Sequence, residues 1–197
     1  MTKLLIAFYS MSGTNREAAA IAARAAQDLG ADVRMTRFSE TVPQAVVDTN
    51  PDWSKEQNAS RSIPVVTAED VEWATSILFV FPTRFGTMPA QVKAFVDGLG
   101  GLWFEGKLAN KAVSVMTSAQ NPHGGQEATL LSTFPVFAHW GAVVVTPGYV
   151  DPVLFEAGGN PYGYSHTVGK PFDDVAQRAI AVQVKRLVDI GKRLSDL

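Results

Sequence analysis

Buried strands are the clearest pattern along the 197-residue chain. Two short, almost continuous apolar runs, at residues 3–9 and 76–81, are typical of strands covered on both faces. Two further strands are predicted at residues 111–117 and 141–149. Residues 31–38 instead alternate between apolar and polar side chains, which predicts a more exposed strand at an edge of the sheet. The sequence therefore predicts five strands.

Apolar residues at helical spacing separate these strands. The predicted helices occupy residues 14–29, 68–75, 88–99, 125–140 and 172–194. Thr67 and Asp70 form a capping box at the start of the second helix. Because a crossover helix readily joins parallel strands, the alternation predicts one domain over residues 1–197. We expect an α/β fold with a doubly wound, five-stranded parallel sheet and helices on both faces.

Two segments lack any periodicity. Residues 39–67 carry Pro43, Pro51 and Pro64, and we interpret them as a long surface connection. Residues 150–171 form the second such segment. Connections of this length are usually functional or form interfaces.

Composition narrows the possible functions. Hydrophobic residues make up 46% and charged residues 18% of the chain, so intrinsic disorder is excluded. The net charge of −2 has no block of like charges, which argues against nucleic acid as a partner. No apolar run approaches the ~20 residues that span a membrane, and no signal peptide is predicted. The absence of cysteine excludes thiolate metal sites and fits a reducing compartment, so we expect a cytoplasmic protein.

The candidate chemistry lies in loops that follow strands, because open α/β sheets bind ligands outside the carboxyl ends of their strands. The first loop places hydroxyls and an amide at a helix N-terminus, a site that favours phosphate. It consists of Ser10, Met11, Ser12, Gly13, Thr14 and Asn15. Its single glycine disfavours a dinucleotide fingerprint and favours a monophosphate. The alternative interpretation is simple capping of the helix by Thr14 or Asn15.

The second and third loops would hold a planar heterocycle whose phosphate sits in the first loop. The candidates in the second loop are Pro82, Thr83, Arg84, Phe85 and Gly86. Those in the third loop are Ser118, Ala119, Gln120, Asn121 and Gly124. Residues 101–107 resemble a Walker A loop, but Leu108 replaces its magnesium-binding hydroxyl and a helix precedes it. Strands one and three end without a carboxylate, so a magnesium-dependent receiver domain is disfavoured and no metal is expected.

Six motifs, in order along nearly the whole chain, resemble the WrbA-type NAD(P)H:quinone oxidoreductases, which are flavodoxin-like FMN proteins. They are SMSGTN at 10–15, PTRFG at 82–86, GGLW at 100–103, GGQE at 124–127, AHWG at 138–141 and NPYG at 160–163. The resemblance implies FMN as cofactor, NADH or NADPH as donor, a quinone as acceptor and a homo-oligomer, either dimer or tetramer. It also implies a flavodoxin-like fold.

The resemblance also assigns residues. It places the FMN phosphate at the first loop and the isoalloxazine ring near Thr83, Arg84, Phe85 and residues 118–124. His139 of the AHWG motif would reach the flavin site, from the same chain or a neighbouring subunit; by itself it fits a structural histidine at a helix end. Trp103 would wall the substrate pocket. Ser12 stands where the family often has an aromatic residue that contacts the nicotinamide nucleotide, and the third loop is one residue longer than usual.

The expected reaction is a ping-pong transfer of two electrons from NAD(P)H through the flavin to a quinone. The alternative is a flavodoxin-like one-electron carrier without a substrate site of its own. Such carriers tend to be acidic around the flavin, whereas the three loops contain no Asp or Glu before Glu127. A scaffold that has lost its ligand is disfavoured by the intact loops. The sequence therefore favours a two-electron enzyme.

Overall fold

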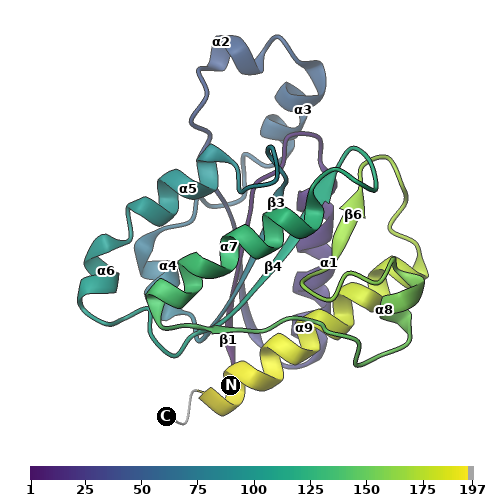
Figure 1. The fold of residues 1–197 in the computed structure, drawn as a ribbon. Coiled ribbons are helices and arrows are strands. Elements are labelled where there is room, and N and C mark those ends of the chain that lie inside the picture. The colour runs from purple at the N-terminus through teal and green to yellow at the C-terminus, as the bar shows by residue number, and fades with distance from the viewer. Residues whose placement is uncertain (195–197) are drawn as a thin grey trace.

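The computed structural model describes residues 1–194 and contains a parallel sheet between two layers of helices (Figure 1). Its strands are β1 (Lys3–Phe8), β2 (Asp32–Arg37), β3 (Ser76–Pro82), β4 (Ala112–Ala119), β5 (Val143–Val144) and β6 (Ser165–Thr167). The order is β2-β1-β3-β4-β5, and β6 also pairs with β4. This is the flavodoxin-like order of a doubly wound sheet, so the predicted fold class is confirmed.

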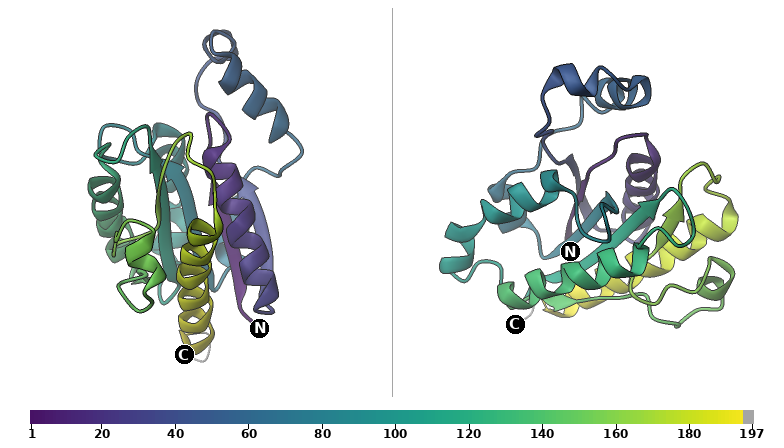
Figure 2. Two further views of the ribbon diagram at one scale, coloured as in Figure 1. Left: turned by 90° about the vertical axis from the view of Figure 1, so that its right-hand side faces the viewer. Right: turned by 45° about the horizontal axis from the view of Figure 1, so that its top comes forward.

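The helices cover both faces of the sheet, as predicted. They are α1 (Thr14–Asp28), α2 (Gln44–Val47), α3 (Pro51–Ala59), α4 (Ala68–Trp73), α5 (Ala90–Asp97), α6 (Gly100–Phe104), α7 (Gln126–Trp140), α8 (Val153–Glu156) and α9 (Asp174–Leu194). α1 and α9 pack on one face, and α4, α5 and α7 on the other (Figure 2). Among the described residues no helix is both long and apolar enough to cross a membrane.

The two-residue period of β1 divides its side chains between two cores. Leu4 and Ile6 face the α1–α9 layer, whereas Leu5 and Ala7 face the opposite layer. Every residue of β3 and β4 is also buried, which explains why these strands read as continuous apolar runs. The strong burial holds the carboxyl ends of β1, β3 and β4 together at one edge of the sheet.

Residues 39–67, which we interpreted as a long surface connection, contain two helices, α2 and α3. Pro43 and Pro51 stand at the starts of these two helices and do not interrupt them. Pro51 is the first residue of α3, and the Asn50 side chain caps that helix by accepting hydrogen bonds from the backbone N–H groups of Asp52 and Trp53. The segment stands beyond the carboxyl ends of the strands (Figure 1).

The predicted fifth strand over residues 141–149 is also wrong in its extent. Only β5, at Val143–Val144, pairs with the start of β4. The chain then leaves the sheet toward Pro147, and proline cannot donate a ladder hydrogen bond. It returns as β6, which pairs with the end of β4 and was not predicted. The fifth position of the sheet is therefore shared by two short strands.

A buried amide anchors the returning chain. The Gln183 side chain on α9 donates to Ser114 Oγ (2.7 Å) and to the Val115 carbonyl (2.9 Å), and accepts from the Tyr164 N–H (2.7 Å). Beside it, a Cβ on Gly163 would lie 2.3 Å from the Val115 carbonyl oxygen, so only glycine fits this close approach. The glycine of the NPYG motif thus lets β6 reach β4.

Candidate functional site

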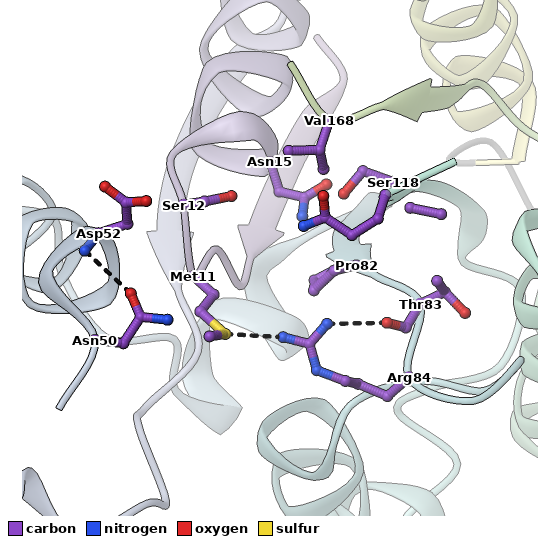
Figure 3. Close-up of a pocket in the computed structure, with 12 residues that line it drawn as sticks. Met11, Ser12, Asn15, Asn50, Asp52, Pro82, Thr83, Arg84, Ser118 and Val168 are labelled. Carbon is purple, nitrogen blue, oxygen red and sulfur yellow. Dashed lines mark hydrogen bonds between the residues drawn. The ribbon is translucent and has the colours of Figure 1, made fainter. Parts of the chain in front are cut away.

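The three predicted loops converge on one cleft at the carboxyl edge of the sheet, with a volume of about 390 Å³. Nine predicted residues line it: Met11, Ser12, Asn15, Pro82, Thr83, Arg84, Ser118, Ala119 and Gln120. Figure 3 shows the side chains of Asn15, Ser118 and Arg84 gathered around this space, although they come from three separate elements. The volume lies in the range of pockets that hold small cofactors.

The first loop leaves the N-terminus of α1 without a side-chain cap. Gly13 is the N-cap residue and adopts φ 93°, a left-handed conformation that suits glycine. Its N–H donates to Ser10 Oγ (3.0 Å), which tightens the turn. No side chain among the described residues caps the helix, so the interpretation of Thr14 or Asn15 as capping residues is wrong. The first-turn N–H groups and the positive end of the helix dipole therefore suit an anion.

Arg84 places a cation in the cleft without a carboxylate partner. Its guanidinium donates to the Thr83 carbonyl (3.0 Å) and to Met11 Sδ (3.2 Å), a weak acceptor (Figure 3). Arg84 takes part in no ion pair formed by residues 1–194. Since a guanidinium is always charged, this group remains available to an anionic or electron-rich ligand.

The second loop is held against α7 by two threonines. Gly86 N–H donates to Thr83 Oγ1 (3.2 Å), which also accepts a hydrogen bond from Thr129 Oγ1 (2.6 Å). Phe85 lies at the tip with φ 50° and its side chain fully exposed. A bulky residue with positive φ is strained unless the surroundings hold it. The loop therefore presents an aromatic ring to solvent, next in sequence to the lining residue Arg84.

The end of β4, just before the third loop, contributes the only buried side-chain polar atom within residues 1–194 that lacks a hydrogen-bond partner, Ser118 Oγ. Ser118 is 1% exposed and lines the cleft. Farther along the loop, a Cβ on Gly124 would lie 2.5 Å from Ala119 Cβ, so this position requires glycine. An unsatisfied buried hydroxyl is costly unless a ligand or water bonds it. Ser118 is accordingly a strong indication of a bound polar group.

Three lining residues were missed by the sequence analysis. Asn50 and Asp52 come from α3, and Val168 follows β6. The pair Asn50–Pro51 is an N-cap signal that would have revealed the start of α3, but not its position over the cleft. Asp52 also lines a neighbouring cavity of about 640 Å³, which shares Ser12 and Val168 with the cleft. The loops are free of carboxylates, yet the assembled cleft contains one.

The structure does not bring Trp103 and His139 into this cleft. The Trp103 indole N–H donates to the His139 carbonyl (2.8 Å), and both residues line another cleft of about 380 Å³ near the end of α7. α7 has 15 residues, so its two ends lie about 21 Å apart. Within one chain these residues are therefore remote from the loops, and their predicted roles require a second subunit.

Two rejected alternatives can be checked directly. The segment that resembles a Walker A loop forms the short helix α6 after α5, and not a phosphate loop between a strand and a helix. No group of three or more His, Asp or Glu side chains within residues 1–194 has the arrangement of a metal site. The chemistry of the cleft rests on hydroxyls, N–H groups, one guanidinium and the Asp52 carboxylate.

The chain is similar in sequence to known proteins. Residues 4–151 match a family described as NADPH-dependent FMN reductase. A protein of Deinococcus radiodurans named NAD(P)H dehydrogenase (quinone) is 48% identical over 193 residues, covering 98% of this chain and 96% of the relative. A protein of the same name from Archaeoglobus fulgidus is 37% identical over 195 residues, covering 98% and 100%.

Solved structures agree on the fold. The flavodoxin, WrbA-like protein from Agrobacterium tumefaciens has a TM-score of 0.66 at 16% identity and covers 98% of this chain and 99% of its own. A flavodoxin from the domain Archaea has a TM-score of 0.60 at 15% identity, with coverages of 98% and 99%. The strand order and the loop cleft thus define a flavodoxin-like protein. More specifically, the chain belongs to the NADPH-dependent FMN reductase family.

Proposed function

We propose that this protein is an FMN-dependent NAD(P)H dehydrogenase (quinone), which transfers two electrons from NADH or NADPH to a quinone by a ping-pong reaction. The observation that carries the proposal is the cleft in which an uncapped helix N-terminus, the Arg84 cation and the orphan Ser118 hydroxyl face one space. The relatives named above support the activity, and family membership supports FMN.

The residues present fit FMN in their donor types. A phosphate suits the first loop, from Ser10 to Asn15, because helix N-termini bind anions. A hydroxylated chain suits Ser118, whose Oγ lacks a partner. An electron-rich ring suits the second loop with Thr83, Arg84 and Phe85, and the third loop to Gly124.

Bound FMN supplies the redox chemistry, because its isoalloxazine ring can accept a hydride and pass on two electrons. The chain supplies position and charge. Arg84 favours negative charge on a ligand beside it, as fixed donors do where charge develops. Ser12 would contact the donor nucleotide. In a ping-pong reaction the oxidised donor leaves before the quinone enters, so one exposed face suffices for both substrates.

The proposed assembly is a homo-oligomer, either a dimer or a tetramer, acting in the cytoplasm. Its support is the separation of Trp103 and His139 from the cleft of their own chain, together with the exposure of Trp103 (53%) and Phe104 (85%). In such an assembly Trp103 would wall the substrate pocket of a neighbour and His139 would reach its flavin. A chain without cysteine suits a reducing compartment.

Stopped-flow spectroscopy tests the reaction. The protein loaded with FMN is mixed anaerobically with NADH or NADPH, and then with benzoquinone. We expect loss of flavin absorbance on the first mixing and its return on the second, with parallel lines in double-reciprocal plots of steady-state rates. Absence of bleaching with both nucleotides would contradict the proposal and indicate a one-electron carrier. Intersecting lines would contradict only the ping-pong order.

A further inference from the structure

The carboxylate of Glu40 forms hydrogen bonds with several segments around the cleft. Glu40 lies beyond the end of β2, at the carboxyl edge of the sheet, and its carboxylate accepts five hydrogen bonds. Two reach Oε2, from Tyr9 Oη (2.9 Å) and Trp53 Nε1 (3.1 Å). Three reach Oε1, from Gln91 Nε2 (2.6 Å) and the N–H groups of Thr41 (2.9 Å) and Val42 (3.0 Å). A surface carboxylate whose only role is solubility would not accept so many hydrogen bonds.

The three side-chain donors lie next to segments that line the cleft. Tyr9 directly precedes Ser10 and the first loop. Gln91 lies on α5, which follows the second loop. Trp53 lies on α3, next in sequence to the lining residue Asp52. Glu40 therefore connects two predicted loops with the helix that the sequence analysis missed.

The position of α3 determines one wall of the cleft. Its only buried residue is Glu56, 3% exposed, whose two carboxylate oxygens share the Nε–H of Arg16 on α1 (2.9 and 3.0 Å). With so little apolar contact, α3 depends on polar anchors at Glu56 and Trp53. Because Asn50 caps the same helix, a shift of Trp53 would carry Asn50 and Asp52 with it.

We propose that Glu40 is a positioning residue for the cofactor site, which sets α3 against the first and second loops so that Asn50 and Asp52 form a wall of the cleft. This inference rests on the proposed FMN site and extends it to residues outside the three loops. The carboxylate is required because a neutral amide replacing it cannot accept at both ends. In Glu40→Gln, an amide nitrogen facing Trp53 Nε1 would place two donors together.

The test is fluorescence titration of FMN with the protein stripped of flavin. We expect Glu40→Gln to weaken FMN binding about tenfold and Trp53→Phe about threefold, since the first affects several hydrogen bonds and the second removes one. Gln44→Ala is the matched control. Gln44 lies on α2 of the same segment and is exposed, and within residues 1–194 its side chain donates only to Asp48, so its substitution should change the affinity less than twofold.

A second readout separates positioning from general weakening. Visible circular dichroism at saturating FMN reports the asymmetric surroundings of the bound flavin, and we expect its band shape to change in Glu40→Gln and Trp53→Phe but not in Gln44→Ala. Glu40→Asp keeps the charge and should recover part of the wild-type affinity. If Glu40→Gln does not fold, Trp53→Phe carries the test, because it leaves four of the five hydrogen bonds in place.

Arg84→Ala distinguishes this inference from the proposed site itself. Weakened FMN binding in Arg84→Ala together with wild-type affinity and dichroism in Glu40→Gln and Trp53→Phe would overturn the role of Glu40 alone. Wild-type FMN affinity in Arg84→Ala would contradict the proposed site. An equal loss of affinity in Gln44→Ala would also overturn the role of Glu40, because the effect would then belong to any change in the segment.

Discussion

Two clefts of similar volume lie near opposite ends of α7, and the chemical character of the residues that line them differs. The cleft at the carboxyl edge of the sheet, about 390 Å³, contains one buried hydroxyl without a partner, Ser118 Oγ, beside a helix N-terminus without a side-chain cap. The cleft near the end of α7, about 380 Å³, is lined by Val96, Leu99, Trp103, Val136 and Trp140, with Lys93 and Asp97 paired at its rim.

The difference indicates different occupants. Unsatisfied donors need acceptors, which a phosphate and a flavin ring provide. Exposed aromatic surface instead needs a second surface to exclude water, because burying apolar area is favourable by about 25 cal/mol per Å². We therefore propose a cofactor as the occupant of the first cleft and a second copy of the chain as the occupant of the other. The following predictions test that contrast.

The largest effect is expected when the charge of Arg84 is reversed. Arg84→Glu should weaken FMN binding at least about 100-fold, because a carboxylate would face an anionic ligand at close range. Unfolding of the flavin-free protein by urea should change by less than about 1 kcal/mol, since Arg84 forms no ion pair within residues 1–194. Arg178→Glu on the exposed face of α9 is the control and should leave FMN affinity unchanged.

The second prediction concerns the cleft near the end of α7. Trp103→Glu should convert the oligomer to a smaller species in light scattering and lower quinone reduction about tenfold, while each chain still binds FMN. Leu29→Glu introduces the same charge at an apolar residue of comparable exposure, 42% against 53%, at the end of α1. It should alter neither property. A wild-type protein that is monomeric would refute the assignment of this cleft.

A smaller effect is expected for two serines of β4, which should respond differently to substitution by alanine. Ser118→Ala removes the orphan hydroxyl and should weaken FMN binding several-fold, about the value of one hydrogen bond, without destabilising the flavin-free protein. Ser114 is equally buried, but its hydroxyl donates to the Val145 carbonyl (2.6 Å) and accepts from Gln183 (2.7 Å). Ser114→Ala should therefore cost about 1–2 kcal/mol of unfolding free energy and change FMN affinity less. Equal behaviour of the two variants would count against a ligand at Ser118.

The smallest effect is a pH dependence beside the first loop. Burial, and then the charge of Glu40, raise the pKa of Tyr9 well above its usual value. Above about pH 10 the unfolded chain loses this proton while the folded chain retains it, so stability is fully present below that pH and falls as the pH rises further, by about 1 kcal/mol per pH unit. Burial raises the pKa of Tyr164 as well.

Urea unfolding at pH 9 and pH 11 measures this effect. Tyr9→Phe should reduce the loss of stability between the two pH values, and Tyr9→Phe combined with Tyr164→Phe should reduce it further. Burial lowers the pKa of Lys111, which opposes the trend and remains in all variants. An unchanged alkaline loss in the double variant would show that other groups control it.

The sequence predicted those parts of the site whose structure depends on residues close together along the chain. Continuous apolar runs have to be covered on both faces, so β1, β3 and β4 and the loops after them followed from the pattern. In contrast, the side chains of α3 are mostly polar, so its sequence shows no hydrophobic period that would predict a helix. Its place depends on Glu40 and Arg16, which lie elsewhere in the chain.

The sequence by itself thus determined the strands β1 to β4, the helices α1, α4, α5, α7 and α9, and the loops that could hold a phosphate, because burial periodicity and turn chemistry are local. Only the tertiary structure decided that Asn50 and Asp52 join those loops, that β5 and β6 share one edge of β4, and that Trp103 contacts His139 far from the cleft. These features are set by hydrogen bonds and close approaches between residues distant in sequence. Such contacts produce no periodic pattern in the sequence.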